Sequence, residues 1–261
     1  SFSKRGYTKA MKCTAINSLP FMKMHGLGND FVVVDARDKD IELSNDFVKK
    51  MADRHRGVGF DQLTIIRAGR QLAHLEFFNA DGSKSGACGN ATRCVARYLM
   101  TQNGENTLTL STDHGVLKAY DAGHGMTSVN MGKPGLSWKD IPLIKNVDTL
   151  ALPIPGTPVA TNMGNPHCTF FVDDLARDDL MKSAEQIEHH PLFVEGTNVQ
   201  FVSLIGENHL KMRVWERGVG MTLASGSSSC AAVVAAARLG LTSNAAQIDL
   251  DGGSMYVDWR Q

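Results

Sequence analysis

Two stretches of the sequence share one layout, and this repetition constrains the fold more than any other feature. In each, a loop of glycines and small polar residues leads into a run of small and apolar residues with helical spacing. The loops deliver Cys88 and Ser225 to the start of the helix that follows. Asn29 lies 59 residues before Cys88, and Asn165 lies 60 residues before Ser225. This spacing predicts an internal duplication, the alternative being a chance match of short Gly-Asn segments.

The segments around these loops are rich in strand patterns. Apolar runs at residues 31–35 and 63–68 predict buried strands. Segments 108–123, 198–216 and 248–259 each predict a hairpin, because two strand-like runs flank a short turn that contains glycine. The sequence therefore predicts many short strands and few helices.

Helical spacing of apolar residues occurs in four segments, two of which follow the repeated loops. The helix after Cys88 should bury one face, whereas the helix after Ser225 is small or apolar almost all round and should lie in the core. Asn45 is the expected N-cap of the first helix, and Gly240 the expected C-cap of the last. The four segments are residues 45–55, 91–100, 177–189 and 229–239.

Charge and composition exclude several classes of function. The chain has 27 Lys and Arg residues against 27 Asp and Glu residues and no basic cluster, which disfavours nucleic acids and anionic membranes as partners. No window reaches the roughly 18 apolar residues of a membrane span, so we expect a cytoplasmic protein that acts on a small molecule. The cysteines form no C-x-x-C pair and the histidines no zinc spacing, so we expect reduced thiols and no metal.

Cys88 is the strongest candidate for a chemical role. The N–H groups and partial positive charge at a helix N-terminus lower a thiol pKa from its ordinary value of about 8.5, so we expect a thiolate near neutral pH. The same N–H groups bind carboxylates. With the two loops facing each other, a substrate carbon between Cys88 and Ser225 has one acid–base group on each side. This is the arrangement of a racemase that needs no cofactor.

Six segments resemble, in order and spacing, the signature segments of the diaminopimelate epimerase family. They are KMHGLGNDFVVVD, FDQL, NADGSKSGACGNATRCV, GNPH, GTNVQFV and WERGVGMTLASGSSSCAA, and the resemblance extends over residues 22–261. It implies an isomerase that interconverts LL- and meso-diaminopimelate in lysine biosynthesis, without PLP or metal. It also implies a cytoplasmic homodimer. Two cysteines of the same chain are implied as the acid–base pair.

The fold class that this resemblance implies is α/β (α+β). Two pseudo-symmetric halves are expected, each a β-barrel-like sheet wrapped around a central helix, with the active site between them. The N-terminal half is expected to comprise residues 22–132, joined by a last strand at about 252–261, and the C-terminal half residues 133–251. A stretch with Pro and Gly near residues 130–138 marks the boundary. Residues 1–21 show no periodicity and are expected to be an extension, a processed leader or a cloning remnant.

The resemblance assigns roles to residues near the reacting carbon. Cys88 matches the first catalytic cysteine. Gly89 and Asn90 match the loop that holds the substrate α-carboxylate. Asn29 and Gln62 match positions that contact the substrate near this carbon.

A second set of residues matches positions that recognise the distal amino-acid end of the substrate. Arg217 can bind a carboxylate through two N–H groups, Glu216 can accept a hydrogen bond from an ammonium group, and three amides can fix the orientation. His167 closes the GNPH segment and is expected near the site in a supporting role. The three amides are Asn79, Asn165 and Asn198, and Gly226 and Ser227 are further substrate-binding candidates in the second loop.

Ser225 stands where the family carries its second catalytic cysteine. A serine hydroxyl is far less acidic than a thiol, so two-base epimerisation is expected to be impaired. Three explanations stay open: an engineered replacement of cysteine, a natural enzyme in which one thiol performs exchange or elimination, and a degenerate homologue that only binds its ligand. Cys230 lies five residues further along, on the predicted helix, and is not expected to substitute.

Two other functions fit the same residues. One is a racemase, epimerase or dehydratase of another amino acid, such as histidine or hydroxyproline, that uses a single cysteine. The other is a hydrolase in which Cys88 is the nucleophile and His167 its base, with an asparagine as the third member. Deuterium exchange at the substrate α-carbon without hydrolysis separates a racemase from a hydrolase.

Overall fold

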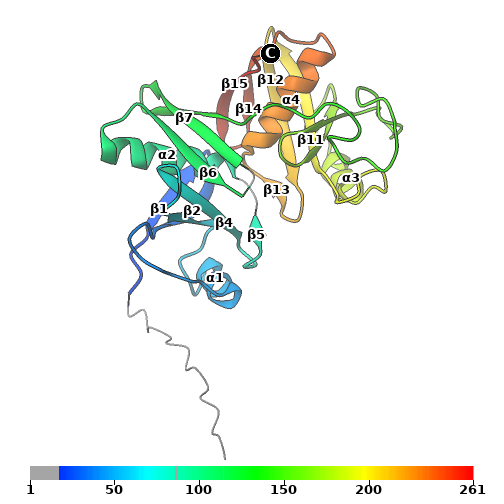
Figure 1. Cartoon of the computed structure of the whole chain (residues 1–261). Helices are drawn as coiled ribbons and strands as arrows, with labels where there is room; N and C mark the ends of the chain where they lie inside the picture. The colour runs from blue at the N-terminus through cyan, green and yellow to red at the C-terminus, as the bar shows by residue number, and fades with distance from the viewer. Residues whose placement is uncertain (1–17, 86–87, 114, 261) are drawn as a thin grey trace, which may run out of the picture.

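The computed structural model describes residues 18–85, 88–113 and 115–260. The chain forms two mixed β-sheets, and each sheet has a long helix, α2 (Gly89–Asn103) or α4 (Gly226–Arg238), packed against it (Figure 1). The first sheet is drawn in blue to green and the second in green to red (Figure 1). The predicted fold class, α/β with two pseudo-symmetric halves, is confirmed.

The first sheet is built from the N-terminal part of the chain. Its strands follow the order β1-β2-β3-β4-β6-β7-β8, and the short β5 pairs with β4 outside this order. The predicted buried runs are β2 and β3, which pair in parallel. The strands are β1 (Met22–Gly26), β2 (Asn29–Asp35), β3 (Gln62–Arg67), β4 (Ala73–Asn79), β5 (Lys84–Ser85), β6 (Thr107–Thr112), β7 (Gly115–Gly123) and β8 (Met126–Asn130).

The second sheet contains the remaining strands. Its order is β15-β14-β12-β11-β10-β9, and β13 pairs with β12 outside this order. Together with β6-β7 of the first sheet, the pairs β11-β12 and β14-β15 confirm the three predicted hairpins. The strands are β9 (Val159–Asn162), β10 (Pro166–Phe171), β11 (Asn198–Gly206), β12 (His209–Glu216), β13 (Gly220–Thr222), β14 (Ala245–Leu250) and β15 (Gly253–Asp258).

Both sheets repeat one pattern of strand directions. Along β1-β2-β3-β4-β6-β7 the neighbours pair antiparallel, parallel, antiparallel, parallel and antiparallel. The series β9-β10-β11-β12-β14-β15 follows the same succession of directions. The short strands β5 and β13 occupy matching side positions. The internal duplication predicted from the two loops is therefore confirmed.

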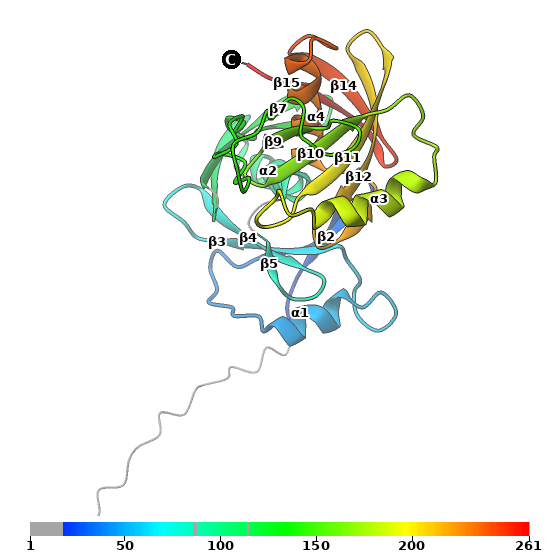
Figure 2. The ribbon, with the colours of Figure 1, turned by 90° about the vertical axis from the view of Figure 1, so that its right-hand side faces the viewer.

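Two of the helices are central to the two halves. In the first half, α2 contacts β1, β6, β7 and β8, whereas α4 contacts β9, β10, β11, β14 and β15 in the second half. The helix α3 lies beside β11 and β12 (Figure 2). Within the described residues, no helix combines the length and apolar character needed to cross a bilayer. The helices are α1 (Asn45–Ala52), α2 (Gly89–Asn103), α3 (Asp179–Glu188) and α4 (Gly226–Arg238).

Burial on both faces explains why the sequence of β2 is continuously apolar. Phe31 and Val33 belong to the buried cluster around Leu99 of α2. Val32, on the opposite face, belongs to the cluster that contains Val48 of α1. Both faces of the strand are covered, so alternation of polar and apolar residues is absent.

Helix starts differ from the sequence-based expectations. The N-cap of α1 is Ser44, whose Oγ accepts a hydrogen bond from the Phe47 N–H at 3.2 Å, and not Asn45. The two residues are adjacent and both are good N-caps, so sequence alone does not separate them. Helices α2 and α4 begin directly after Cys88 and Ser225, earlier than predicted. Their first turns are glycine and polar residues, which carry no apolar periodicity.

The last strand does not join the first sheet, which corrects the expected domain composition. Strand β15 pairs with β14 from Ala245↔Asp258 to Leu250↔Gly253, because the two-residue turn between them favours a local hairpin. The turn nevertheless contacts the first half, since Gly252 and Gly253 lie against Leu27. The boundary near residue 132 stays a prediction.

Replacing Gly252 should destabilise the fold, because a Cβ at this position would overlap the Leu27 carbonyl oxygen. We expect Gly252→Ala to lower the free energy of unfolding by about 1–3 kcal/mol, as overpacking does. Gly206→Ala is the control, because its Cβ would meet only the His209 side chain, with the Cβ at 3.4 Å and Nδ1 at 4.0 Å. Urea unfolding measures both variants, and equal midpoints would contradict a tight contact at Gly252.

Candidate active site

Cys88 occupies the N-cap of α2. Its backbone is extended, with φ −148° and ψ 104°, and its sulfur accepts a hydrogen bond from the Ala91 N–H at 3.4 Å. The Thr92 hydroxyl donates to the Cys88 carbonyl at 2.7 Å. The first turn of the helix therefore holds the thiol in place.

Ser225 occupies the same position at the start of α4. Its backbone angles, φ −144° and ψ 120°, are close to those of Cys88, and its Oγ accepts from the Ser228 N–H at 3.4 Å. A Cβ built on Gly89 would lie 3.5 Å from the Gly226 Cα, so the first residues of the two helices lie against each other. The structure thus brings the two predicted acid–base positions to one region.

The predicted substrate-contacting amides of the first half gather at one edge of the first sheet. Asn29 begins β2, Gln62 begins β3 and Asn79 ends β4. These positions share an edge because β2 and β3 are parallel and β4 is antiparallel to β3. The Gln62 amide donates to Asn79 Oδ1 at 3.1 Å.

The second sheet repeats this arrangement. Asn198 begins β11, Glu216 ends β12, and Asn165 directly precedes β10. The Asn198 amide donates to the Pro166 carbonyl at 2.9 Å, and its Oδ1 accepts from the Arg217 N–H at 3.0 Å. The residues predicted for the distal end of the substrate therefore lie at equivalent edges of the two sheets.

Asn90 joins the two halves. Its side chain is buried, and its Nδ2 lies 3.3 Å both from Asn29 Oδ1 and from the Ala224 carbonyl oxygen in the loop before α4. Asn29 in turn donates to Asp61 Oδ2 at 2.8 Å, and the Asp61 carboxylate pairs with Arg54 at 2.8 Å. A continuous polar network therefore runs from the surface to the start of α4.

Glu216 lies at the Ser225 end of the site. Its Oε1 accepts from the Thr222 hydroxyl at 2.7 Å. Burial raises the pKa of the Glu216 carboxyl, and the Thr222 and Ser225 hydroxyls lower it in part. Ser227 Oγ lies 3.5 Å from Ser225 Oγ. Glu216 is therefore closer to the second acid–base position than its predicted role at the distal end implies.

Two charged residues of the site, Asp61 and Arg93, were not singled out by the sequence patterns. Asp61 accepts from Asn29, and an Arg93 Nη2–H donates to the Asn90 side-chain oxygen. Both lie inside segments that match the family, FDQL and GNATRC. A charged residue within a matched segment is the signal that points to them.

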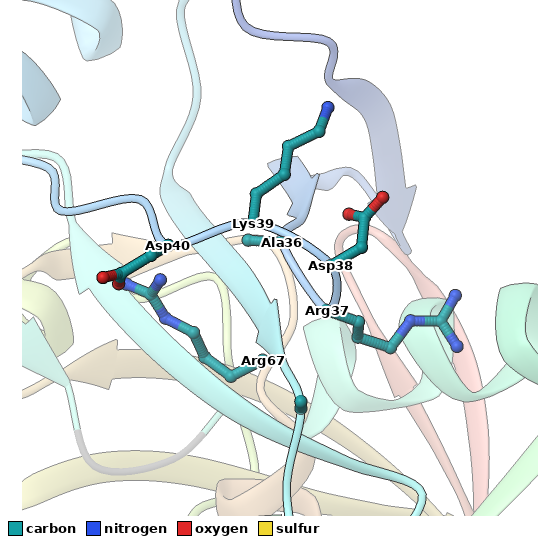
Figure 3. A pocket seen from close by; sticks show the side chains of 7 residues that line it. Ala36, Arg37, Asp38, Lys39, Asp40 and Arg67 are labelled. Carbon is teal, nitrogen blue, oxygen red and sulfur yellow. The ribbon is translucent and has the colours of Figure 1, made fainter. Parts of the chain in front are cut away.

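A separate hollow on the first half contains none of these residues. It is lined mainly by residues 36–40 and Arg67 (Figure 3). Its arginines are already paired, Arg37 with Asp35 at 2.7 Å and Arg67 with Glu76 at 3.1 Å. We therefore place the candidate active site at the two helix N-termini.

Comparison with known sequences identifies the family. The profile described as diaminopimelate epimerase matches residues 21–137 and 159–261. The chain belongs to the diaminopimelate epimerase family. A diaminopimelate epimerase from Acidiphilium cryptum is 48% identical over 246 residues, which are 92% of this chain and 89% of that relative. Another, from Rhodospirillum centenum, is 46% identical over 92% of this chain and 84% of its own length.

Solved structures share the fold of this diaminopimelate epimerase family member at low sequence identity. A predicted epimerase from Pseudomonas aeruginosa has a TM-score of 0.65 at 14% identity, over 92% of both chains. A phenazine biosynthesis protein of the PhzF family from Bacillus anthracis has a TM-score of 0.62 at 15% identity, over 91% of this chain and 88% of its own. These likenesses concern the fold alone.

Burial reverses the expected titration of Cys88. Desolvation of the thiolate raises the pKa of Cys88 to about 12, and the Glu216 carboxylate also raises it. The Ala91 N–H and the Arg93 guanidinium act in the opposite direction without cancelling this rise. The direction of this shift is opposite to the one expected from the helix N-terminus alone. In this family member, desolvation favours the protonated thiol.

His167 is fully buried and its ring is held by polar neighbours. One ring nitrogen lies 2.8 Å from Asn165 Oδ1, and the other lies 3.4 Å from both Gln200 Oε1 and Ser228 Oγ. Burial lowers the pKa of the imidazole to about 3. Among the hydrogen bonds of the described residues, none joins His167 to Cys88. The hydrolase hypothesis therefore lacks the contact between base and nucleophile that it requires.

Cys88 should react slowly with iodoacetamide near neutral pH, because only the thiolate attacks. With a pKa of about 12, its alkylation rate should rise about tenfold per pH unit between about pH 8 and pH 10, whereas an ordinary thiol of pKa about 8.5 levels off. Mass spectrometry of the Cys88 peptide measures the rate, and the urea-unfolded chain serves as the control. A plateau near pH 9 in the folded protein would contradict the raised pKa.

Proposed function

We propose that this chain is a PLP-independent diaminopimelate epimerase, an isomerase of lysine biosynthesis that interconverts the LL and meso forms. One observation carries the proposal: Cys88 and Ser225 are equivalent N-caps of two helices whose first residues lie against each other. The relatives at 46% and 48% identity, both diaminopimelate epimerases, support the choice of substrate.

The two N-caps flank the α-carbon of the substrate in this mechanism. The Cys88 thiolate removes the α-proton from one face, and the electron pair of the C–H bond delocalises onto the α-carboxylate. In the complete two-base reaction, a thiol at position 225 then delivers a proton to the opposite face. Backbone N–H groups in the first turns of α2 and α4, beginning with Gly89 and Gly226, stabilise the negative charge on the carboxylate.

Substrate binding promotes ionisation of Cys88. The negative charge of Glu216 is one cause of the raised Cys88 pKa. An ammonium group of the substrate beside Glu216 offsets that charge and so lowers the cost of forming the thiolate. The thiolate therefore forms in the substrate complex and not in the free protein.

The distal amino-acid end of the substrate binds at the paired sheet edges. Arg217 is partly exposed, and its Nη1 donates to the Glu195 carbonyl at 2.9 Å. The planar guanidinium has further N–H donors that suit a carboxylate. Asn165 and Asn198, at the same edge of the second sheet, supply amides that orient this group.

Ser225 restricts proton transfer to one face of the substrate α-carbon. Its hydroxyl is far less acidic than a thiol, so it does not supply an anionic base. Cys88 alone then removes and returns the α-proton on its own side. Exchange with solvent continues, whereas conversion between LL- and meso-diaminopimelate is impaired.

We also propose a cytoplasmic homodimer, as the family resemblance implies, and a division of the chain near residue 132. The absence of strands between β8 and β9 supports this boundary within the described residues. Analytical ultracentrifugation measures the oligomeric state, and a single monomeric species at micromolar concentration would contradict the dimer.

Ser225→Cys should restore two-base epimerisation, because a thiol then stands at both N-caps. We expect the rate of conversion of LL-diaminopimelate to the meso form to increase by about 100-fold or more, the range of general acid–base effects. Chiral chromatography of the product measures this rate. No gain in the rate would overturn the proposed function.

Ser243→Cys is the matched control for this substitution. It introduces a thiol at an exposed position between α4 and β14, outside the candidate site. It should leave the epimerisation rate unchanged, since the thiol does not stand opposite Cys88. A gain equal to that of Ser225→Cys would contradict the importance of the N-cap position.

The chain with Ser225 should catalyse exchange of one α-proton without inversion. In heavy water we expect deuterium at the α-carbon of one isomer of diaminopimelate, because Cys88 reaches only one face. Mass spectrometry detects the incorporation, and Cys88→Ala should abolish it. Incorporation that persists in Cys88→Ala would contradict the assignment of Cys88 as the base.

A further inference from the structure

Arg93 is a partly buried cation that connects the two helix N-termini. It lies on α2, five residues after Cys88, and its Nη2 donates to the Asn90 side-chain oxygen. A Cβ built on Gly226 would lie 3.3 Å from Arg93 Nη1. The guanidinium therefore reaches from α2 to the first residue of α4.

The charge of Arg93 has no carboxylate partner in the part of the chain that the structure describes. On the same helix, Arg97 does form an ion pair, with Asp121 at 2.9 Å. Burial lowers the pKa of the Arg93 guanidinium. The N-termini of α2 and α4 carry partial charges of the same sign. An unpaired, partly buried cation beside them does not stabilise the fold through an ion pair, which favours a role in the site.

The pseudo-symmetry of the halves shows that this cation has no counterpart on α4. Cys230 lies five residues after Ser225, at the position equivalent to Arg93 on α2. The second helix thus carries a thiol where the first carries a guanidinium. The Arg93 charge lowers the pKa of Cys88 against the effect of burial and of Glu216. The two N-caps therefore differ in their electrostatic surroundings.

We propose that Arg93 is a positioning residue of the acid–base site, which holds the Asn90 side chain between the two halves and places positive charge where Gly226 meets Gly89, the residue after Cys88. Because Arg93 binds Asn90 Oδ1, the Asn90 amide nitrogen is directed toward Asn29 Oδ1 and the Ala224 carbonyl, each at 3.3 Å. This inference rests on the proposed function, since it assigns Arg93 to the same site.

Alkylation of Cys88 by iodoacetamide tests the proposal without any substrate. We expect Arg93→Gln to slow alkylation at about pH 9 by about five- to tenfold, because loss of the positive charge raises the Cys88 pKa by up to about one unit. Arg93→Lys keeps the charge, and its rate should stay within about twofold of the parent. Glu216, which also faces Cys88, is the same in all variants.

Arg97→Gln is the matched control, because Arg97 lies one turn further along α2 and pairs with Asp121. It should alkylate at the parent rate. Circular dichroism establishes that each variant is folded, and Arg93→Met replaces Arg93→Gln as the uncharged variant where the latter does not fold.

Two outcomes would overturn the role of Arg93. One is an unchanged rate in the folded uncharged variant, and the other is an Arg93→Lys variant as slow as the uncharged one. Failure of Ser225→Cys to gain epimerase activity is a separate result, which counts against the proposed function and leaves the alkylation comparison intact.

Discussion

The site depends on the close approach of two helix N-termini. Gly89 and Gly226 form this contact, since a Cβ built on either would lie 3.5 Å from the Cα of the other. Each glycine follows an N-cap, so the contact fixes Cys88 and Ser225 in one region. Two positive helix ends in contact repel each other, and an anion between them offsets this repulsion. The geometry therefore suits a substrate carboxylate.

Burial determines the resting charges of the site. It raises the pKa values of Cys88 and Glu216 and lowers that of His167, so in each group it favours the uncharged form. Ionising any of these groups then costs free energy until a substrate with its own ammonium and carboxylate groups binds. The protonated form of a thiol is weakly nucleophilic, so desolvation also lowers the reactivity of Cys88.

Much of the fold was predictable because it depends on local sequence. The duplication, the hairpins and the buried runs of β2 and β3 follow from periodicity and turn residues, and all are confirmed. The N-cap positions of Cys88 and Ser225 were implied by the loops that precede them. The pKa of Cys88 was not predictable, because it depends on desolvation and on Glu216, which comes from the other half of the chain. Arg93 was missed for the same reason, since its neighbour Gly226 lies on α4.

The turn of the final hairpin affects when the site can form during synthesis. Gly252 lies against the Leu27 carbonyl, and its N–H donates to the Leu223 carbonyl at 2.9 Å. One late turn therefore contacts both the loop after β1 and the loop before α4. Domains generally fold in order as they leave the ribosome, so the first half emerges well before this turn exists. The nascent chain therefore carries Cys88 on an incomplete site until the hairpin of β14 and β15 has been translated.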